Sequence, residues 1–182
     1  MVIAHDKSIY AFEFDIHKIL DSKDHKWVYG SFLLWIQGKR IGNPNDYTAL
    51  DACYSWILDF DNLHMHTDTH EFSSLSAIEI MTLYNQYCRV DNIPVKSIVN
   101  RSHEDIEYGI YIRQQLDISE FGMTSFDNVT LLMLDYDLLC KRIIMQQFSV
   151  PPIEFVVQNK DILTAIDKFK ILYANEVARK TS

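Results

Sequence analysis

The chain has 182 residues and a formal net charge of −8, with 48% hydrophobic and 13% aromatic residues but only five glycines. This length and composition predict one domain over residues 1–182 with its own hydrophobic core, and they argue against disorder. The acidic balance disfavours binding to nucleic acid, whose phosphates repel acidic side chains, and favours a basic protein partner.

Other features predict the compartment in which the protein works. The cysteines Cys53, Cys88 and Cys140 are odd in number and form no CxxC motif, so a reducing environment is expected. The N-terminal segment lacks the basic start and apolar region of a signal peptide, and no apolar run reaches the length of a membrane span. We therefore expect a cytoplasmic protein without a membrane partner.

The first part of the chain is predicted to form strands. Residues 9–16 alternate, with aromatic and aliphatic side chains on one face and Glu13 and Asp15 facing solvent. Residues 27–36 are apolar on both faces, which predicts a central strand. Within it, Gly30 indicates a bulge or a close backbone approach. The QGKR segment after it predicts a hairpin turn in which glycine supplies positive φ.

Helical periodicity follows. Residues 47–60 are predicted to form a helix, with Asp46 as its N-cap. Its apolar face consists of Leu50, Cys53, Tyr54 and Ile57. A second helix is predicted over residues 75–88, where Ser76 and Glu79 have the spacing of a capping box.

The second half of the chain is predicted to return to strands and to end in a helix. The weakly patterned segments 95–100 and 108–116 are predicted as short strands, and residues 153–157 as another. Residues 128–148 are predicted to form a hairpin that turns at Asp135-Tyr136-Asp137, and residues 162–173 keep helical spacing. Together these elements predict an α+β fold with a mostly antiparallel sheet packed against two central helices and a C-terminal helix.

One segment invites a metal-site interpretation. It can be compared with the HxHxDH motif of metallo-β-lactamase-type hydrolases and contains His64, His66, Asp68 and His70. However, Thr69 separates the aspartate from the last histidine, and the segment follows a predicted helix rather than the buried strand that would fix the ligands. A solvated loop without metal is therefore favoured over a metal-dependent hydrolase.

No other catalytic pattern stands out. The glycines form no phosphate-binding loop, and no GxSxG nucleophile motif is present. The carboxylate pairs Asp59/Asp61 and Asp135/Asp137 lie at element ends and are interpreted as solvated charges. Cys53 and Cys88 lie on apolar helix faces, which predicts buried structural thiols. We therefore predict a binding module without catalytic residues or cofactors.

The acidic residues are unevenly distributed. No Lys or Arg lies between Arg40 and Arg89, a stretch that carries seven acids, whereas residues 102–140 carry eight acids and only Arg113. Among aromatic residues, Trp35 and Trp56 are expected in the core, whereas Trp27 and Tyr29 begin a strand beside a turn and can serve as exposed anchors. The predicted partner-binding residues are Asp46, Asp51, Asp59, Asp61, Asp68, Glu71, Trp27 and Tyr29. The stretch 102–140 is the rival surface.

Residues 9–60 resemble the immunity protein 42 family of bacterial polymorphic toxin systems, which include contact-dependent growth inhibition. The resemblance begins with the strand YAFEFDI and continues through a hairpin of the form WxxGxFxxWIxGxxIG into a helix that begins near TxL. The matching residues are Trp27, Gly30, Phe32, Trp35, Ile36, Gly38, Ile41, Gly42, Thr48 and Leu50. The hairpin at residues 126–144 is similar to a late hairpin of this family.

The resemblance implies a cytoplasmic inhibitor that binds the C-terminal domain of its cognate toxin, as a 1:1 heterodimer, and neutralises it. Many such toxins are nucleases with basic surfaces, so an acidic inhibitor fits electrostatically. Two alternatives stay open at this point: the metal-dependent hydrolase described above, and an adaptor subunit that binds a partner without inhibiting it.

Overall fold

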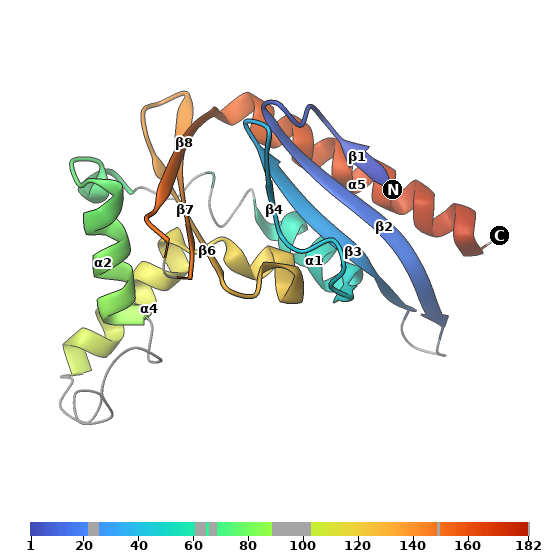
Figure 1. Ribbon diagram of the computed structural model, residues 1–182, viewed down its shortest axis with the longest axis horizontal. Helices are drawn as coiled ribbons and strands as arrows, with labels where there is room; N and C mark the ends of the chain where they lie inside the picture. The colour runs from blue at the N-terminus through green and yellow to red at the C-terminus, as the bar shows by residue number, and fades with distance from the viewer. Residues whose placement is uncertain (22–25, 61–64, 66–68, 89–102, 149, 182) are drawn as a thin grey trace.

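In the computed structural model, the chain folds into two antiparallel sheets with helices packed against them, which confirms the predicted α+β class (Figure 1). The structure describes residues 1–21, 26–60, 65, 69–88, 103–148 and 150–181. Its strands are β1 (Val2–Ala4), β2 (Tyr10–Asp21), β3 (Lys26–Ile36), β4 (Lys39–Ile41), β5 (Thr48–Ala49), β6 (Val129–Asp135), β7 (Cys140–Gln147) and β8 (Ile153–Gln158). Its helices are α1 (Leu50–Phe60), α2 (Ala77–Cys88), α4 (His103–Leu116) and α5 (Asn159–Thr181), with the 3-10 helices η2 (His70–Phe72) and η3 (Ser119–Phe126).

The first sheet has the order β1-β2-β3-β4, and β5 also pairs with β3. β3 is therefore the central strand, as its apolar sequence predicts. Figure 1 shows α5 running along one face of this sheet. On that face the rings of Phe12 and Phe14 lie 5.4 and 5.3 Å from the ring of Phe169 on α5. The predicted C-terminal helix thus covers the apolar face of the predicted first strand.

The structure confirms that Gly30 lies at a β-bulge and at a close approach of two backbones. The register of β2 against β3 shifts between Ile16 and Lys18, opposite Gly30, which is a β-bulge. A Cβ atom at position 30 would lie 1.8 Å from the carbonyl oxygen of Asp15. The two backbones approach so closely here that only glycine fits.

The hairpin turn after β3 is also as predicted. Gln37 and Gly38 have φ values of 48° and 80°, and the two residues connect β3 directly to β4. Two consecutive positive φ values define a type I′ turn, whose twist matches that of the flanking strands. Glycine at the second position removes part of the steric cost.

The outer face of the first sheet differs from the prediction. Trp35 is only half-buried there, and its Nε1–H donates a hydrogen bond of 2.6 Å to Oε2 of Glu13. Lys7 forms an ion pair with the same carboxylate and lies 4.3 Å from the centroid of the Trp35 ring. Glu13, expected in solvent, is therefore 4% exposed. The prediction was wrong because alternation along one strand does not reveal that Lys7 of the preceding loop and Trp35 of the neighbouring strand cover the carboxylate.

Helix α1 begins at Leu50, later than predicted, because Thr48 and Ala49 pair with β3 as β5. Asp46 is consequently no N-cap: its Oδ1 accepts a hydrogen bond from Nδ2 of Asn43 in the preceding loop. The predicted apolar face is correct, since Leu50, Cys53 and Ile57 are buried and Tyr54 stacks on Tyr173 of α5.

Helix α2 starts with the predicted capping box. The backbone N–H and the hydroxyl of Ser76 both donate to Oε2 of Glu79 at 2.7 Å, and the N–H of Glu79 donates to Oγ of Ser76 at 3.3 Å. These bonds satisfy donors that a helix start leaves unpaired. Ile80 and Tyr84 on the predicted stripe are buried.

The second sheet has the order β6-β7-β8 and includes the predicted hairpin and the predicted strand at residues 153–157. β6 alternates between two apolar clusters. Leu131 and Met133 join the cluster under the first sheet, whereas Leu132 and Leu134 pack with α2 and α4. This sheet therefore separates the two clusters, which explains why its strands are apolar on both faces.

Residues 108–116 are helical in the structure, so their prediction as a strand was wrong. Their apolar residues alternate, but Ile112 and Leu116, one helical turn apart, are the ones buried. A Cβ atom at Gly109 would lie 2.6 Å from the carbonyl oxygen of Tyr87 on α2. The close contact with α2 thus decides the conformation. The other predicted strand, residues 95–100, lies outside the described residues.

Candidate binding surface

Two of the predicted binding acids, Asp51 and Asp46, form hydrogen bonds within the fold. Oδ1 of Asp51 accepts a hydrogen bond of 3.4 Å from the N–H of Val28, so this half-buried carboxylate ties α1 to β3. Asp46 is half-buried and holds the loop before β5 through Asn43. Neither carboxylate projects freely from the surface, although Asp51 was expected to do so.

Two other predicted binding acids, Asp59 and Glu71, are exposed. Asp59 lies on the outer side of α1, and Glu71 in η2 accepts a hydrogen bond of 3.0 Å from the hydroxyl of Tyr111 on α4. Asp61 and Asp68 lie outside the described residues. The predicted acidic surface is therefore represented in the structure by Asp59 and Glu71, which sit on different elements.

The predicted aromatic anchors differ from each other. Trp27 is 45% exposed, whereas Tyr29 is half-buried and stacks on Tyr47 with 5.5 Å between ring centroids. Tyr47 itself is 52% exposed. Trp27 thus keeps the exposure that an anchor needs, and the stacked pair extends the exposed aromatic area on the first sheet.

The histidine-rich segment is described only in part. His64, His66 and Asp68 lie outside the described residues, and His70 is exposed in η2. Within the described ranges, no cluster of three or more His, Cys, Asp or Glu side chains is arranged to hold a metal ion. The buried Cys53 adds no reactive group, because burial raises the pKa of its thiol to about 12.

We expect the protein, purified without a histidine tag, to contain far less than a stoichiometric amount of zinc or nickel. The reason is that the segment lacks the supporting strand and the complete ligand set that fix a zinc site. Elemental analysis of the wild type and of a His66→Ala variant measures this. A full equivalent of zinc that disappears in His66→Ala would contradict the expectation.

Thr69, directly before the last histidine of this segment, is held by a buried polar network. The N–H and the hydroxyl of Thr69 donate to Oδ2 of Asp135 at 3.1 and 3.0 Å, and Nζ of Lys141 donates to Oδ1 at 2.7 Å. Lys141 is only 1% exposed. Asp135 is therefore a structural group and not the solvated turn charge that the sequence suggests. Its neighbour Asp137 is exposed and accepts the N–H groups of Leu139 and Cys140 in the turn.

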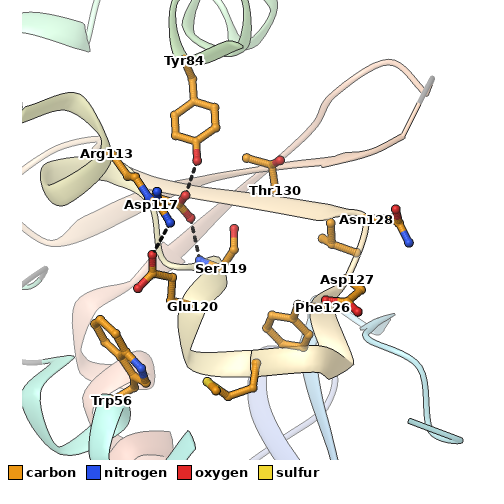
Figure 2. A pocket seen from close by; sticks show the side chains of 12 residues that line it. Trp56, Tyr84, Arg113, Asp117, Ser119, Glu120, Phe126, Asp127, Asn128 and Thr130 are labelled. Carbon is orange, nitrogen blue, oxygen red and sulfur yellow. Dashed lines mark hydrogen bonds and ion pairs between the residues drawn. The ribbon is translucent and has the colours of Figure 1, made fainter. Parts of the chain in front are cut away.

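A cleft of about 550 Å³ lies where α1, α2, α4, η3 and the start of β6 meet. We call it the η3 cleft, and Figure 2 shows its lining side chains. They are Trp56, Tyr84, Arg113, Asp117, Ser119, Glu120, Met123, Phe126, Asp127, Asn128, Val129 and Thr130. Most of them belong to the stretch 102–140, the rival acidic surface in the sequence.

Hydrogen bonds fix the carboxylates on one side of the cleft. Nη2 of Arg113 lies 2.6 Å from Oε1 of Glu120. Asp117 accepts hydrogen bonds from the hydroxyl of Tyr84 and, at 2.8 Å, from the N–H of Ser119. Burial and the charge of Asp117 raise the pKa of Tyr84, so its phenol stays protonated and keeps donating.

The cleft also exposes apolar side chains. Trp56 on α1 and Met123 in η3 are each 38% exposed, whereas the sequence placed Trp56 in the core. Trp56 was misjudged because it lies beside the apolar stripe of α1, three residues after Cys53. The signal that could have revealed it is its spacing of three residues from the exposed Asp59, which marks the solvent side of the helix.

The described part of the molecule thus combines exposed acids, exposed aromatic side chains and an open cleft. The chain belongs to the immunity protein 42 family, whose model matches residues 1–174. No curated protein and no solved structure matches the chain. Among the described helices, none has the length and apolar content needed to cross a membrane.

Proposed function

We propose that the chain is a cytoplasmic immunity protein that binds the C-terminal toxin domain of a polymorphic toxin system, such as contact-dependent growth inhibition, and neutralises it in a 1:1 heterodimer. The observation that carries the proposal is the family match, which spans residues 1–174 and so involves both sheets and most of α5. The protein acts by binding and needs neither a catalytic residue nor a cofactor.

The charge of the chain supports a nuclease as the toxin. Nucleases present basic surfaces to phosphates, and a protein with a net charge of −8 is attracted to such a surface. Asp59, Glu71 and the carboxylates of the η3 cleft present negative charge on the described surface. No observation favours the hydrolase or the adaptor over this function.

The first test is co-expression with the product of the reading frame adjacent to the gene. We expect the two proteins to purify as a stable one-to-one complex and the toxin to lose its activity in the complex. A neighbouring protein that binds but keeps its full activity would instead identify an adaptor. Absence of any complex with a folded, active toxin would refute the proposed function.

The second test is charge reversal at the exposed predicted acids. In the double variant Asp59→Lys/Glu71→Lys, we expect association with the toxin at low salt to be slower by about tenfold, because complementary charge acts mainly on the association rate. Added salt screens charges, so it should reduce the difference in association rate between the wild type and this double variant. Stopped-flow or surface-based kinetics measure the rate.

The matched control is Asp21→Lys/Asp167→Lys, which changes the net charge equally at exposed positions on β2 and α5. We expect a clearly smaller effect from this control. Equal slowing in both double variants would show that only the net charge matters, and an unchanged rate in Asp59→Lys/Glu71→Lys would place the interface away from α1 and η2.

A further inference from the structure

We propose that the η3 cleft receives a lysine or arginine side chain of the toxin, held between the Trp56 ring and the carboxylates of Asp117, Glu120 and Asp127. This assignment rests on the proposed function and specifies the surface and the partner chemistry. The proposed contact consists mainly of residues from the stretch 102–140. Trp56 is the residue that α1 contributes.

The charge of the cleft is the first argument. Its lining contains three carboxylates and one guanidinium, that of Arg113. Arg113 is paired with Glu120 at 2.6 Å, so the cleft already holds one basic side chain of the protein itself. Asp127 is exposed, and the described residues offer its carboxylate no hydrogen-bonding partner. The cleft therefore carries more negative than positive charge, which favours a basic side chain of a partner.

The rigidity of the cleft is the second argument. Asp117 is held from both sides, by the hydroxyl of Tyr84 and by the N–H of Ser119. Ser119 in turn accepts a hydrogen bond of 2.7 Å from the N–H of Leu131 in β6. Because these groups are already fixed before a partner arrives, binding costs little side-chain ordering.

The apolar lining is the third argument. Figure 2 shows Trp56 at one end of the cleft and Asp127 at the other, with Glu120 and Phe126 between them. A cation can lie over an indole ring while its alkyl stem contacts apolar side chains. Exposed tryptophans are also the residue type that most often anchors protein interfaces. This combination suits Lys or Arg better than a purely apolar side chain.

The backbone at Met123 supports the same location. Met123 has φ 49° and ψ −137°, a conformation that favours glycine, and it interrupts the helical geometry of η3. Residues of this kind persist only where the surrounding structure holds them, and they are enriched at functional sites. Met123 is exposed at the cleft, where its flexible thioether side chain can adapt to a partner.

The test measures binding of the toxin encoded by the adjacent reading frame to the full chain and to variants. Trp56→Ala and Asp127→Lys should each weaken the complex by about tenfold or more. Trp56→Phe should retain more affinity than Trp56→Ala, because a phenyl ring still offers an aromatic face. Leu58→Ala is the matched control, since Leu58 is 42% exposed on the same helix but does not line the cleft.

Met123→Gly separates folding from binding. It should melt at the same or a higher temperature than the wild type, because glycine adopts this backbone without strain, and yet bind the toxin more weakly. Lys→Glu and Arg→Glu substitutions across the toxin should include one whose loss of binding is restored by Asp127→Lys. That pair identifies the side chain in the cleft.

The outcomes distinguish this proposal from the function on which it rests. If the wild type binds and neutralises the toxin while Trp56→Ala and Asp127→Lys bind equally well, the cleft is not the contact and the immunity function stands. If Trp56→Ala weakens binding but Asp127→Lys does not, the occupant is apolar and the proposal is overturned. If the wild type binds no toxin, the immunity function itself fails.

Discussion

Replacing Asp135 with Asn is expected to lower the free energy of unfolding by about 3 kcal/mol, because the change leaves the ammonium group of Lys141 buried without a counter-charge. Lys141 is 1% exposed, and Asp135 at 2.7 Å is the carboxylate that pairs with it. Chemical denaturation of the wild type and the variant measures the difference.

The control is the double variant Asp135→Asn/Lys141→Met. It removes both charges and keeps a long side chain in the buried position, so we expect it to be more stable than Asp135→Asn alone. If the single variant is as stable as the wild type, the pair does not stabilise the hairpin. If the double variant is less stable than the single one, the lysine contributes through packing instead.

The same pair predicts a pH dependence. Burial raises the pKa of Asp135, but hydrogen bonds from Lys141 and Thr69 lower it by more, so the net pKa lies below its ordinary value. A lowered pKa in the folded state adds stability above the pKa of the unfolded chain, and this stability is lost as the pH falls through the folded value. The difference between wild type and Asp135→Asn should therefore shrink below about pH 4. A constant difference would contradict this linkage.

Replacing Gly30 with Ala is expected to destabilise the protein by at least about 3 kcal/mol, because overpacking against a backbone atom cannot be relieved by a side-chain rotation. The added Cβ would lie 1.8 Å from the carbonyl oxygen of Asp15 and 2.7 Å from Cδ1 of Leu50. β2 must then move away from β3, and the Leu50 side chain must shift as well. Thermal and chemical unfolding measure the loss.

Gly38→Ala serves as the comparison. No atom lies within 4 Å of a Cβ at position 38, but its φ is +80°, so only the backbone conformation is penalised, by about 1 kcal/mol. We expect Gly30→Ala to be clearly the more damaging variant. A Gly30→Ala protein as stable as Gly38→Ala would mean that β2 and β3 separate easily at the bulge.

Much of the fold could be predicted because several elements carry local signals. The Ser76/Glu79 capping box and the glycine at position 38 act through residues that are neighbours in sequence. Residues 108–116 could not be assigned in this way. Their alternating pattern is typical of a strand, but packing of Ile112 and Leu116 against α2 selects the helix.

The candidate site was predictable only in its charge. Acidic stretches can be read from the sequence, but whether a carboxylate faces a partner or holds the fold depends on distant residues. Asp51 and Asp135 both proved to have structural roles through Val28 and Lys141. The η3 cleft brings together residues from 56 to 130, a set that no local pattern connects.

By itself, the sequence determined the α+β class, the central position of β3 and the family, because composition and periodicity act over short distances along the chain. It indicated a bulge or close approach at Gly30, but only the structure showed that Asp15 and Leu50 leave no room for a side chain there. Only the tertiary structure decided which charges are exposed and that Trp56 lines a cleft with Asp117 and Glu120. The reason is physical. Exposure and proximity depend on which segments pack together, and that packing joins residues far apart in the chain.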